Sequence, residues 1–198
     1  MPLGAHKAAL FGVAGVSTGD VVLLHDQDYS GVASASITSG IDSTYGEYIF
    51  KFYNINPATD NVNFSFQVNA SDDVGGDFDE SYITSTFFQA YHDEADTATS
   101  LGYKTANDQA QGTAFQVLAQ GVGNGSDECC AGELFLFNPA STTYVKHFYS
   151  RFSVYEQSDY KDDDFAAGYI NNPLALSEIS FKFASGNFDG TIKMWGVK

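Results

Sequence analysis

The stretch that decides the fold is Tyr48 to Val68, YIFKFYNINPATDNVNFSFQV. In each half of it, a large apolar side chain recurs at every second residue. These residues are Tyr48, Phe50 and Phe52, then Phe64, Phe66 and Val68. A period of two places side chains on one face of an extended strand. Asn56-Pro57 lies between the halves, and proline disfavours the helical region for the residue before it. The stretch therefore predicts a long β-hairpin with its turn at Asn56-Pro57.

A second stretch repeats this pattern from Gly132 to Val154, GELFLFNPASTTYVKHFYSRFSV, with Asn138-Pro139 in the place of Asn56-Pro57. Neither hairpin can bury its apolar face alone, so the two predict two sheets packed face to face. Further strand-like segments follow at intervals of about ten residues, the spacing of antiparallel sandwiches and jelly rolls. They cover residues 21–25, 32–38, 81–91, 113–119, 174–184 and 190–197. The predicted fold is all-β: an antiparallel β-sandwich, jelly-roll-like, with an extended N-terminal arm.

The length of 198 residues suits a single domain, because all-β sandwiches often reach this size undivided. The 17 Phe and 12 Tyr are typical of a β protein with aromatic-filled faces. A chain of this length buries about 70% of its unfolded surface, so its stability requires neither disulfides nor a metal. We expect one sandwich domain over residues 19–198, preceded by an arm over residues 1–18.

The arm combines apolar residues with several glycines, which break any helical pattern. Apolar surface costs about 25 cal/mol per Å² when it is left in water, so the arm needs a partner. It lies either along its own sandwich or on a neighbouring subunit. The expected interface residues are Leu3, Leu10, Phe11 and Val13.

The formal net charge is −16, from 25 acidic and 9 basic residues. Binding to DNA or RNA draws most of its affinity from Lys and Arg at phosphates, so this charge argues against a nucleic-acid partner. It also disfavours anionic membranes, and no apolar run approaches the roughly 18 residues of a membrane span. We expect neither a nucleic acid nor a membrane as partner. The charge is better explained as a source of solubility in a crowded assembly.

One loop, Asn69 to Glu80, is acidic and rich in glycine. Calcium binds several oxygen ligands on flexible loops of this kind. The calcium candidates are Asp73, Asp77, Asp79 and Glu80, although their spacing does not match an EF-hand. We expect a solvated loop and no cofactor, with calcium binding as the alternative.

The four histidines have no metal-binding spacing, and the sequence contains no phosphate-binding loop and no CxxC. A carboxylate pair suited to glycoside cleavage could arise by chance among so many acids. Cys129 and Cys130 are adjacent, so their Cα atoms lie only about 3.8 Å apart. An ordinary disulfide spans roughly 4.4 to 6.8 Å between Cα atoms. We expect two free thiols, with a strained vicinal disulfide or an intermolecular bridge as the alternative. The chain is expected not to be an enzyme.

Surface aromatic residues offer a different chemistry, because amphipathic rings stack on sugars. The alternative is that the same rings fill the sandwich or a subunit interface. The candidates are Tyr91, Tyr103, Tyr155, Tyr160, Tyr169 and Trp195.

The segment from Gln157 to Asp164 is polar and charged and contains DYKDDD, which looks like an epitope tag. It continues into FAAGYI and further strands, so we interpret it as native sequence.

Four segments carry a resemblance to a known family: PLGAHKAALFGVAG, SGIDSTYGEYIFKFYNINPATDNVNFSFQ, GELFLFNPASTTYVKHFYSRF and FKFASGNFDGTIKMWGV. Together the chain resembles structural virion proteins of tailed bacteriophages, especially marine ones. The shared motifs are strands and turns, so the resemblance implies a jelly-roll-like fold and a place in the virion without assigning a catalytic residue. It does not distinguish capsid decoration from a tail or fibre component.

The first functional hypothesis is therefore a non-enzymatic virion protein that associates with itself, preferably as a trimer, and with other virion proteins. Its rival is a carbohydrate-binding module that attaches the particle to host glycans, in a calcium-dependent form if the acidic loop holds the ion. A glycan hydrolase ranks third. A concave groove of aromatic and carboxylate residues would favour the second or third hypothesis, and an arm leaving the domain would favour the first.

Overall fold

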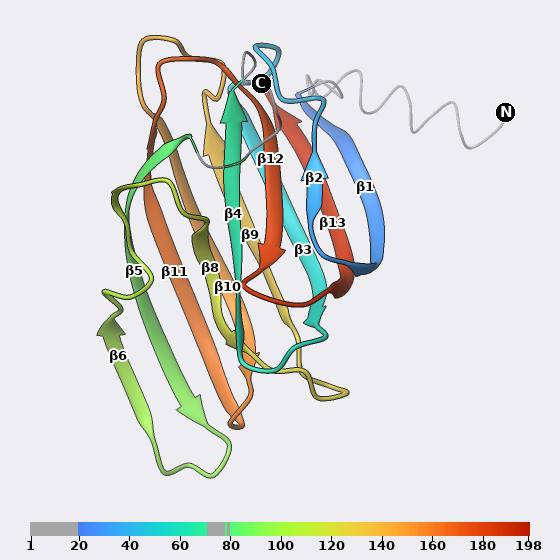
Figure 1. Cartoon of the computed structure of the whole chain (residues 1–198), viewed down its shortest axis with the longest axis vertical. Coiled ribbons are helices and arrows are strands. Elements are labelled where there is room, and N and C mark those ends of the chain that lie inside the picture. Colours follow the sequence, from blue (N-terminus) through green and yellow to red (C-terminus); the bar gives the residue numbers. More distant parts are fainter. Residues whose placement is uncertain (1–19, 71–77, 79) are drawn as a thin grey trace, which may run out of the picture.

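The computed structural model describes residues 20–70, 78 and 80–198, which form antiparallel β-strands and contain no helix (Figure 1). Within these residues there is accordingly no helix long and apolar enough to cross a membrane. The strands are β1 (Val21–Val32), β2 (Ala35–Ile37), β3 (Glu47–Pro57), β4 (Val62–Ala70), β5 (Tyr82–Asp93), β6 (Thr99–Tyr103), β7 (Ala110–Gly112), β8 (Gln116–Val122), β9 (Cys130–Phe137), β10 (Lys146–Glu156), β11 (Tyr160–Asn171), β12 (Leu176–Phe183) and β13 (Phe188–Val197).

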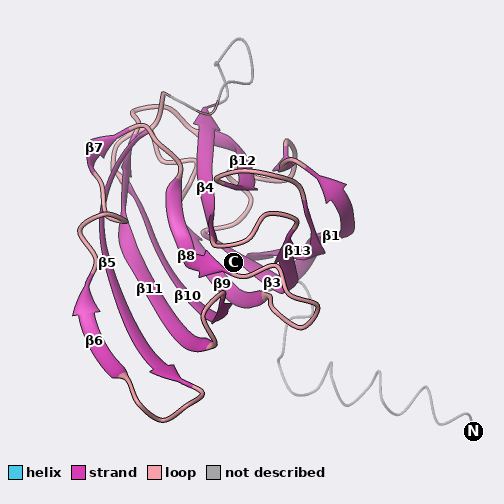
Figure 2. Ribbon diagram, turned by 60° about the horizontal axis from the view of Figure 1, so that its bottom comes forward, coloured by secondary structure: helices cyan, strands magenta, loops and turns pink. Residues whose placement is uncertain are grey.

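The strands form a large and a small layer. The large layer runs β1-β13-β3-β9-β10-β11-β5, with β6 and β7 paired to the far side of β5, and the small layer runs β8-β4-β12-β2. Glu156 of β10 pairs with Val122 of β8, so hydrogen bonding continues from one layer into the other at this corner. Figure 2 shows the large layer curving around the small one. The predicted all-β sandwich is confirmed.

The core lies between the layers and is built from the aromatic alternation seen in the sequence. Phe50 and Phe52 of β3 are buried against Phe181 of β12, and the rings of Phe52 and Phe181 lie 4.9 Å apart in an edge-to-face arrangement. Phe66 of β4 meets Phe148 of β10 in the same way, at 5.1 Å. Such pairs contribute about 0.5–1.5 kcal/mol each beyond the burial of their surface. Ring packing across the layers therefore holds the sandwich together.

The hairpin predicted over Tyr48 to Val68 is wrong in its pairing. β3 pairs with β13 and β9, whereas β4 pairs with β12 and β8, so the connection crosses from one layer to the other. Pro57 is still the last residue of β3, opposite Phe188, and the chain turns at residues 58–61. If β3 and β4 were neighbours in one sheet, the apolar side chains of both strands would lie on the same face of that sheet. Crossing places the sets opposite each other, and the rings of Phe52 and Phe64 then meet at 5.6 Å.

The second stretch does form the predicted hairpin. β9 and β10 pair from Leu136–Phe148 to Cys130–Val154, with Asn138-Pro139 in the connection. Asn138 has a φ of 46°, and its carbonyl accepts a hydrogen bond from the Ser141 N–H at 3.0 Å. Asparagine tolerates this left-handed region better than most residues, which explains its place at the turn.

Some of the predicted features differ or lie outside the described residues. The two strands expected over residues 21–25 and 32–38 are one long strand, β1, and a three-residue strand, β2. The arm expected over residues 1–18 is outside the described part of the chain. The same is true of its interface residues Leu3, Leu10, Phe11 and Val13, and of the calcium candidates Asp73, Asp77 and Asp79.

The charged segment at Tyr160 to Asp164 begins β11, where no strand was predicted. β11 is an interior strand, paired with β10 on one side and with β5 on the other along its whole length. Consecutive acidic residues in such a strand must point alternately to the two faces of the sheet. This arrangement defines the first candidate site.

Candidate functional site

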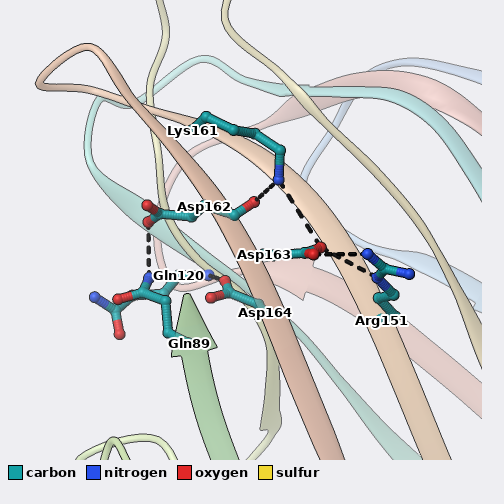
Figure 3. Close-up of polar contacts among 7 residues, drawn as sticks. All are labelled: Gln89, Gln120, Arg151, Lys161, Asp162, Asp163 and Asp164. Atoms are coloured by element: carbon teal, nitrogen blue, oxygen red, sulfur yellow. Dashed lines mark hydrogen bonds and ion pairs between the residues drawn. The ribbon is translucent and has the colours of Figure 1, made fainter. Parts of the chain in front are cut away.

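Three consecutive aspartates of β11 have three different environments (Figure 3). Asp162 and Asp164 point toward the small layer and are buried, with Asp164 fully inaccessible. Asp163 points to the opposite face, where the Arg151 Nη2 donates to its carboxylate at 2.7 Å. Lys161 lies 3.8 Å from the same carboxylate. The sheet therefore buries two acidic groups and exposes the third to basic partners.

The buried aspartates hold the edge of β8 against the large layer. Among the described strands, β8 pairs with β4 along one side and otherwise only with β10 at Val122. Asp164 Oδ2 accepts the backbone N–H of Gln120 at 2.6 Å, so the carboxylate satisfies a donor on β8. Asp162 Oδ2 accepts from Gln89 Nε2 of β5 at 2.7 Å. The other oxygen of Asp164, Oδ1, has no hydrogen-bond partner among the described residues.

Amide side chains continue this polar contact between the layers. Ser85 donates to Gln116 Oε1 at 2.6 Å, and Gln116 donates to the Asn107 carbonyl at 2.9 Å. Asn107 in turn donates to Gln120 Oε1 at 2.5 Å. We call this set the polar seam: Ser85, Gln89, Asn107, Gln116, Gln120, Asp162 and Asp164. It joins β5 and β11 to β8 by hydrogen bonds, whereas the core elsewhere between the layers is built from aromatic and aliphatic side chains.

Burial controls the charge state of the seam. The pKa of Asp164 is raised to about 7, chiefly by burial and to a lesser extent by the neighbouring Asp162, while the Gln120 N–H opposes the change. Burial and then Glu156 raise the pKa of Asp162 to about 6, against the positive charges of Lys104 and Lys161. The pKa of Asp163 is lowered instead, chiefly by its hydrogen bond to Arg151. The two buried carboxylates of the seam, Asp162 and Asp164, thus titrate near neutral pH.

A small pocket opens beside the seam at the β10–β11 turn. Its volume is about 160 Å³. Tyr91 and Tyr160 form a corner of it, with ring centroids 5.2 Å apart and planes at 87°. Lys104 Nζ lies 6.0 Å from the centre of the Tyr91 ring. We call this the tyrosine pocket, and its lining is Gln89, Tyr91, Gln120, Glu156, Ser158, Tyr160 and Asp162.

The second candidate site is the solvent face of the large layer, which carries an apolar row across six strands. Each member is the cross-strand partner of the next, and the stacked rings of Phe135 and Tyr149 lie 4.6 Å apart. Leu23 is 48% exposed and Tyr149 is 46% exposed. The outer row consists of Leu23, Trp195, Ile49, Phe135, Tyr149 and Ala167.

A charged row runs parallel to the outer row, two residues away from it on each of the strands β3, β9, β10 and β13. Lys51 bonds to Glu133 at 2.7 Å, and Lys193 lies 3.0 Å from Asp26. In strand order the charged row reads Asp26, Lys193, Lys51, Glu133 and Arg151. The face therefore combines an apolar stripe with a line of ordered charges.

The aromatic residues predicted to stack on sugars are divided between these places. Tyr91 and Tyr160 meet in the tyrosine pocket, whereas Trp195 belongs to the outer row and Tyr169 to the same face of the sheet. Tyr103 is exposed on β6 and donates to Asp108 at 2.5 Å. The remaining candidate, Tyr155, lies near Cys129 in a separate hollow.

The remaining predicted site residues, Glu80 and the two cysteines, form no candidate site among the described residues. Glu80 is exposed, and no group of three or more potential metal ligands occurs within the described residues. Cys129 and Cys130 are free thiols, as expected, and burial raises the pKa of Cys130 well above its ordinary value.

The sequence prediction missed the polar seam. The only sign of it in the sequence is that Tyr160, Asp162, Asp164 and Ala166 occupy every second position of a strand. The charged residues between them make the segment look like a solvated loop.

Comparison with known proteins adds no relative: a scan of protein-family models, a search of curated proteins and a search of solved structures each give no match.

Proposed function

We propose that this protein is a non-enzymatic structural component of a phage virion that associates with itself through the solvent face of the large layer. The outer row carries the proposal. The exposed face of an antiparallel sheet is ordinarily polar, yet here six neighbouring strands each contribute an apolar residue. Contiguous exposed apolar surface of this kind marks interaction sites.

The proposed occupant of this face is a second copy of the same chain. A two-fold contact places one row against the same row running in the opposite direction. Reversal of the charged row sets Asp26 against Arg151 and Glu133 against Lys193, twice each, with Lys51 near the axis. Four of the five facing positions then carry opposite charges. The face is complementary to itself despite the net charge of −16.

The size of the face suits a reversible contact. Five strand spacings of about 4.8 Å and two rows, each about 7 Å wide, give roughly 340 Å² per subunit. A standard interface buries about 800 Å² per partner. We propose that the arm over residues 1–18 supplies additional contact to a neighbour, as its apolar residues require.

The virion assignment rests on the resemblance of the sequence to structural proteins of tailed phages. A capsid decoration protein and a tail or fibre component both use repeated contacts between copies. The trimer implied by the resemblance stays a prediction, because a three-fold contact joins two different surfaces while the charged row favours a two-fold one. Association with other virion proteins also stays a prediction.

The test is sedimentation equilibrium of the full chain and of Tyr149→Glu. Tyr149 is half exposed, so a charged side chain there is compatible with folding. In the dimer, however, the glutamate would be buried without a partner charge, which costs free energy of association. We expect the full chain to form a dimer or a larger oligomer and the variant to dissociate at least tenfold more readily. Leu101→Glu is the matched control, because Leu101 is 72% exposed on β6 of the same sheet but outside the outer row.

A monomeric full chain at high micromolar concentration would refute the proposal. Equal weakening by Tyr149→Glu and Leu101→Glu would show that the outer row has no special role. A stable trimer that both variants leave unchanged would place the contact elsewhere on the molecule.

A further inference from the structure

We infer that the tyrosine pocket is a saccharide-binding site that takes one neutral sugar ring. This site is separate from the self-association face, because its residues lie on the inner side of β5 and β11, on β8, at the end of β10 and on the β10–β11 turn. It would give the structural protein a second function, attachment to glycans. The inference does not depend on self-association.

The ring geometry is the first support. Tyr91 and Tyr160 stand nearly perpendicular, so one ring offers its face and the other its edge to a group in the corner. The apolar C–H face of a sugar packs on such a ring, while its hydroxyls reach polar neighbours. Neither tyrosine hydroxyl forms a hydrogen bond to another described residue, so both can donate to or accept from a ligand.

The polar lining is the second support, because it mixes donors with acceptors. Glu156 and Asp162 accept hydrogen bonds, and Glu156 is oriented by the backbone N–H of Ser158 at 2.9 Å. Asp162 is fixed by Gln89, which belongs to the rigid sheet. A few positioned polar groups among aromatic walls are typical of small-molecule pockets. Sugar hydroxyls, which both donate and accept, match this lining.

The local charge favours a neutral ligand over a cation. Lys104 Nζ lies over the ring of Tyr91, and Lys104 and Lys161 both act electrostatically on Asp162. The chain therefore already supplies positive charge beside Asp162. A volume of about 160 Å³ holds about five waters at 30 Å³ each, so the pocket admits a single ring and not a longer buried chain.

The test is saturation-transfer NMR of the full chain with a panel of neutral hexoses and N-acetylhexosamines at millimolar concentration, alongside tetramethylammonium as a cationic probe. Tyr160→Ala removes one wall of the pocket. Ser158→Trp is the second variant, because Ser158 is an exposed turn residue and a large ring there obstructs the pocket without removing a buried contact. Tyr169→Ala is the matched control, a tyrosine of the same strand on the opposite face.

We expect transfer to at least one sugar of the panel, a loss of affinity of at least tenfold in Tyr160→Ala and Ser158→Trp, and wild-type affinity in Tyr169→Ala. If Tyr160→Ala does not fold, Ser158→Trp alone decides. The inference is overturned if no sugar of the panel shows transfer, if both pocket variants bind as the wild type does, or if only tetramethylammonium binds. Sedimentation of the same samples measures self-association separately, so either proposal can fail alone.

Discussion

Replacing Asp164 by asparagine should stabilise the protein at neutral and alkaline pH. Asp164 is fully buried, its Oδ1 has no partner among the described residues, and its pKa is raised to about 7, first by burial. The interval from the ordinary value of 3.8 to about 7 corresponds to about 4 kcal/mol, at 1.36 kcal/mol for each pKa unit. This is the free energy that ionisation of Asp164 costs the folded state relative to the unfolded chain.

The sign of the pH dependence follows from the raised pKa. Between about pH 4 and pH 7 the folded protein keeps a proton on Asp164 that the unfolded chain has lost. The free energy of unfolding must therefore fall as the pH rises through this range, and it levels off above it. Asparagine does not titrate, and its Oδ1 can still accept the Gln120 N–H. The variant should match the wild type near pH 4 and exceed it by up to about 4 kcal/mol at pH 8.

Urea unfolding at pH 4.5, 6 and 8 measures this difference. Asp163→Asn is the control, because Asp163 is the next residue, points to the other face and has a lowered pKa. Its surface ion pair with Arg151 is worth at most about 1 kcal/mol, and its loss should leave the slope between pH 4.5 and 8 unchanged. A lower stability of Asp164→Asn than of the wild type at pH 8 would refute the reasoning, as would a wild-type stability that does not fall from pH 4.5 to 8.

Three further predictions address the core, the arm and the acidic loop. Gly132→Ala should destabilise the fold by about 1–3 kcal/mol in urea unfolding, because the added methyl carbon would lie 2.6 Å from the Phe152 ring; unchanged stability would contradict this. Deletion of residues 1–15 should weaken association in light scattering while the circular-dichroism spectrum stays that of a β protein; an unchanged oligomer would exclude the role of the arm, and an unfolded product would place it in its own core. Calcium should leave the melting temperature unchanged, whereas an EGTA-reversible rise of several degrees, lost in Asp77→Asn and Asp79→Asn, would establish a calcium site.

The sequence predicted the layers because its strongest signal, a large apolar residue at every second position, is local. Tyr48, Phe50 and Phe52 had to share one face of a strand, and their volume required an opposing sheet. The Asn138-Pro139 turn was predictable for the same reason, since turn chemistry depends on adjacent residues. These features determined the all-β class, the two-layer core and the β9–β10 hairpin.

The pairing of strands depended on tertiary structure. Turn residues at Asn56-Pro57 are compatible with a hairpin and with a connection that crosses from one layer to the other. The crossing connection is favoured by packing between the layers, because it brings Phe52 into contact with Phe64. Strand order also decides the outer row, because its members are scattered from Leu23 to Trp195 and become neighbours only through the pairing of β1 with β13 and of β13 with β3.

The polar seam shows where sequence reasoning ends. By itself the sequence determined that Asp162, Asp163 and Asp164 are charged residues beside a strand-forming segment. Only the tertiary structure decided that β11 is interior, so that the period of two buries Asp162 and Asp164 and exposes Asp163. The physical reason is that alternation along a strand is a local property, whereas burial of a face depends on which other strands cover it.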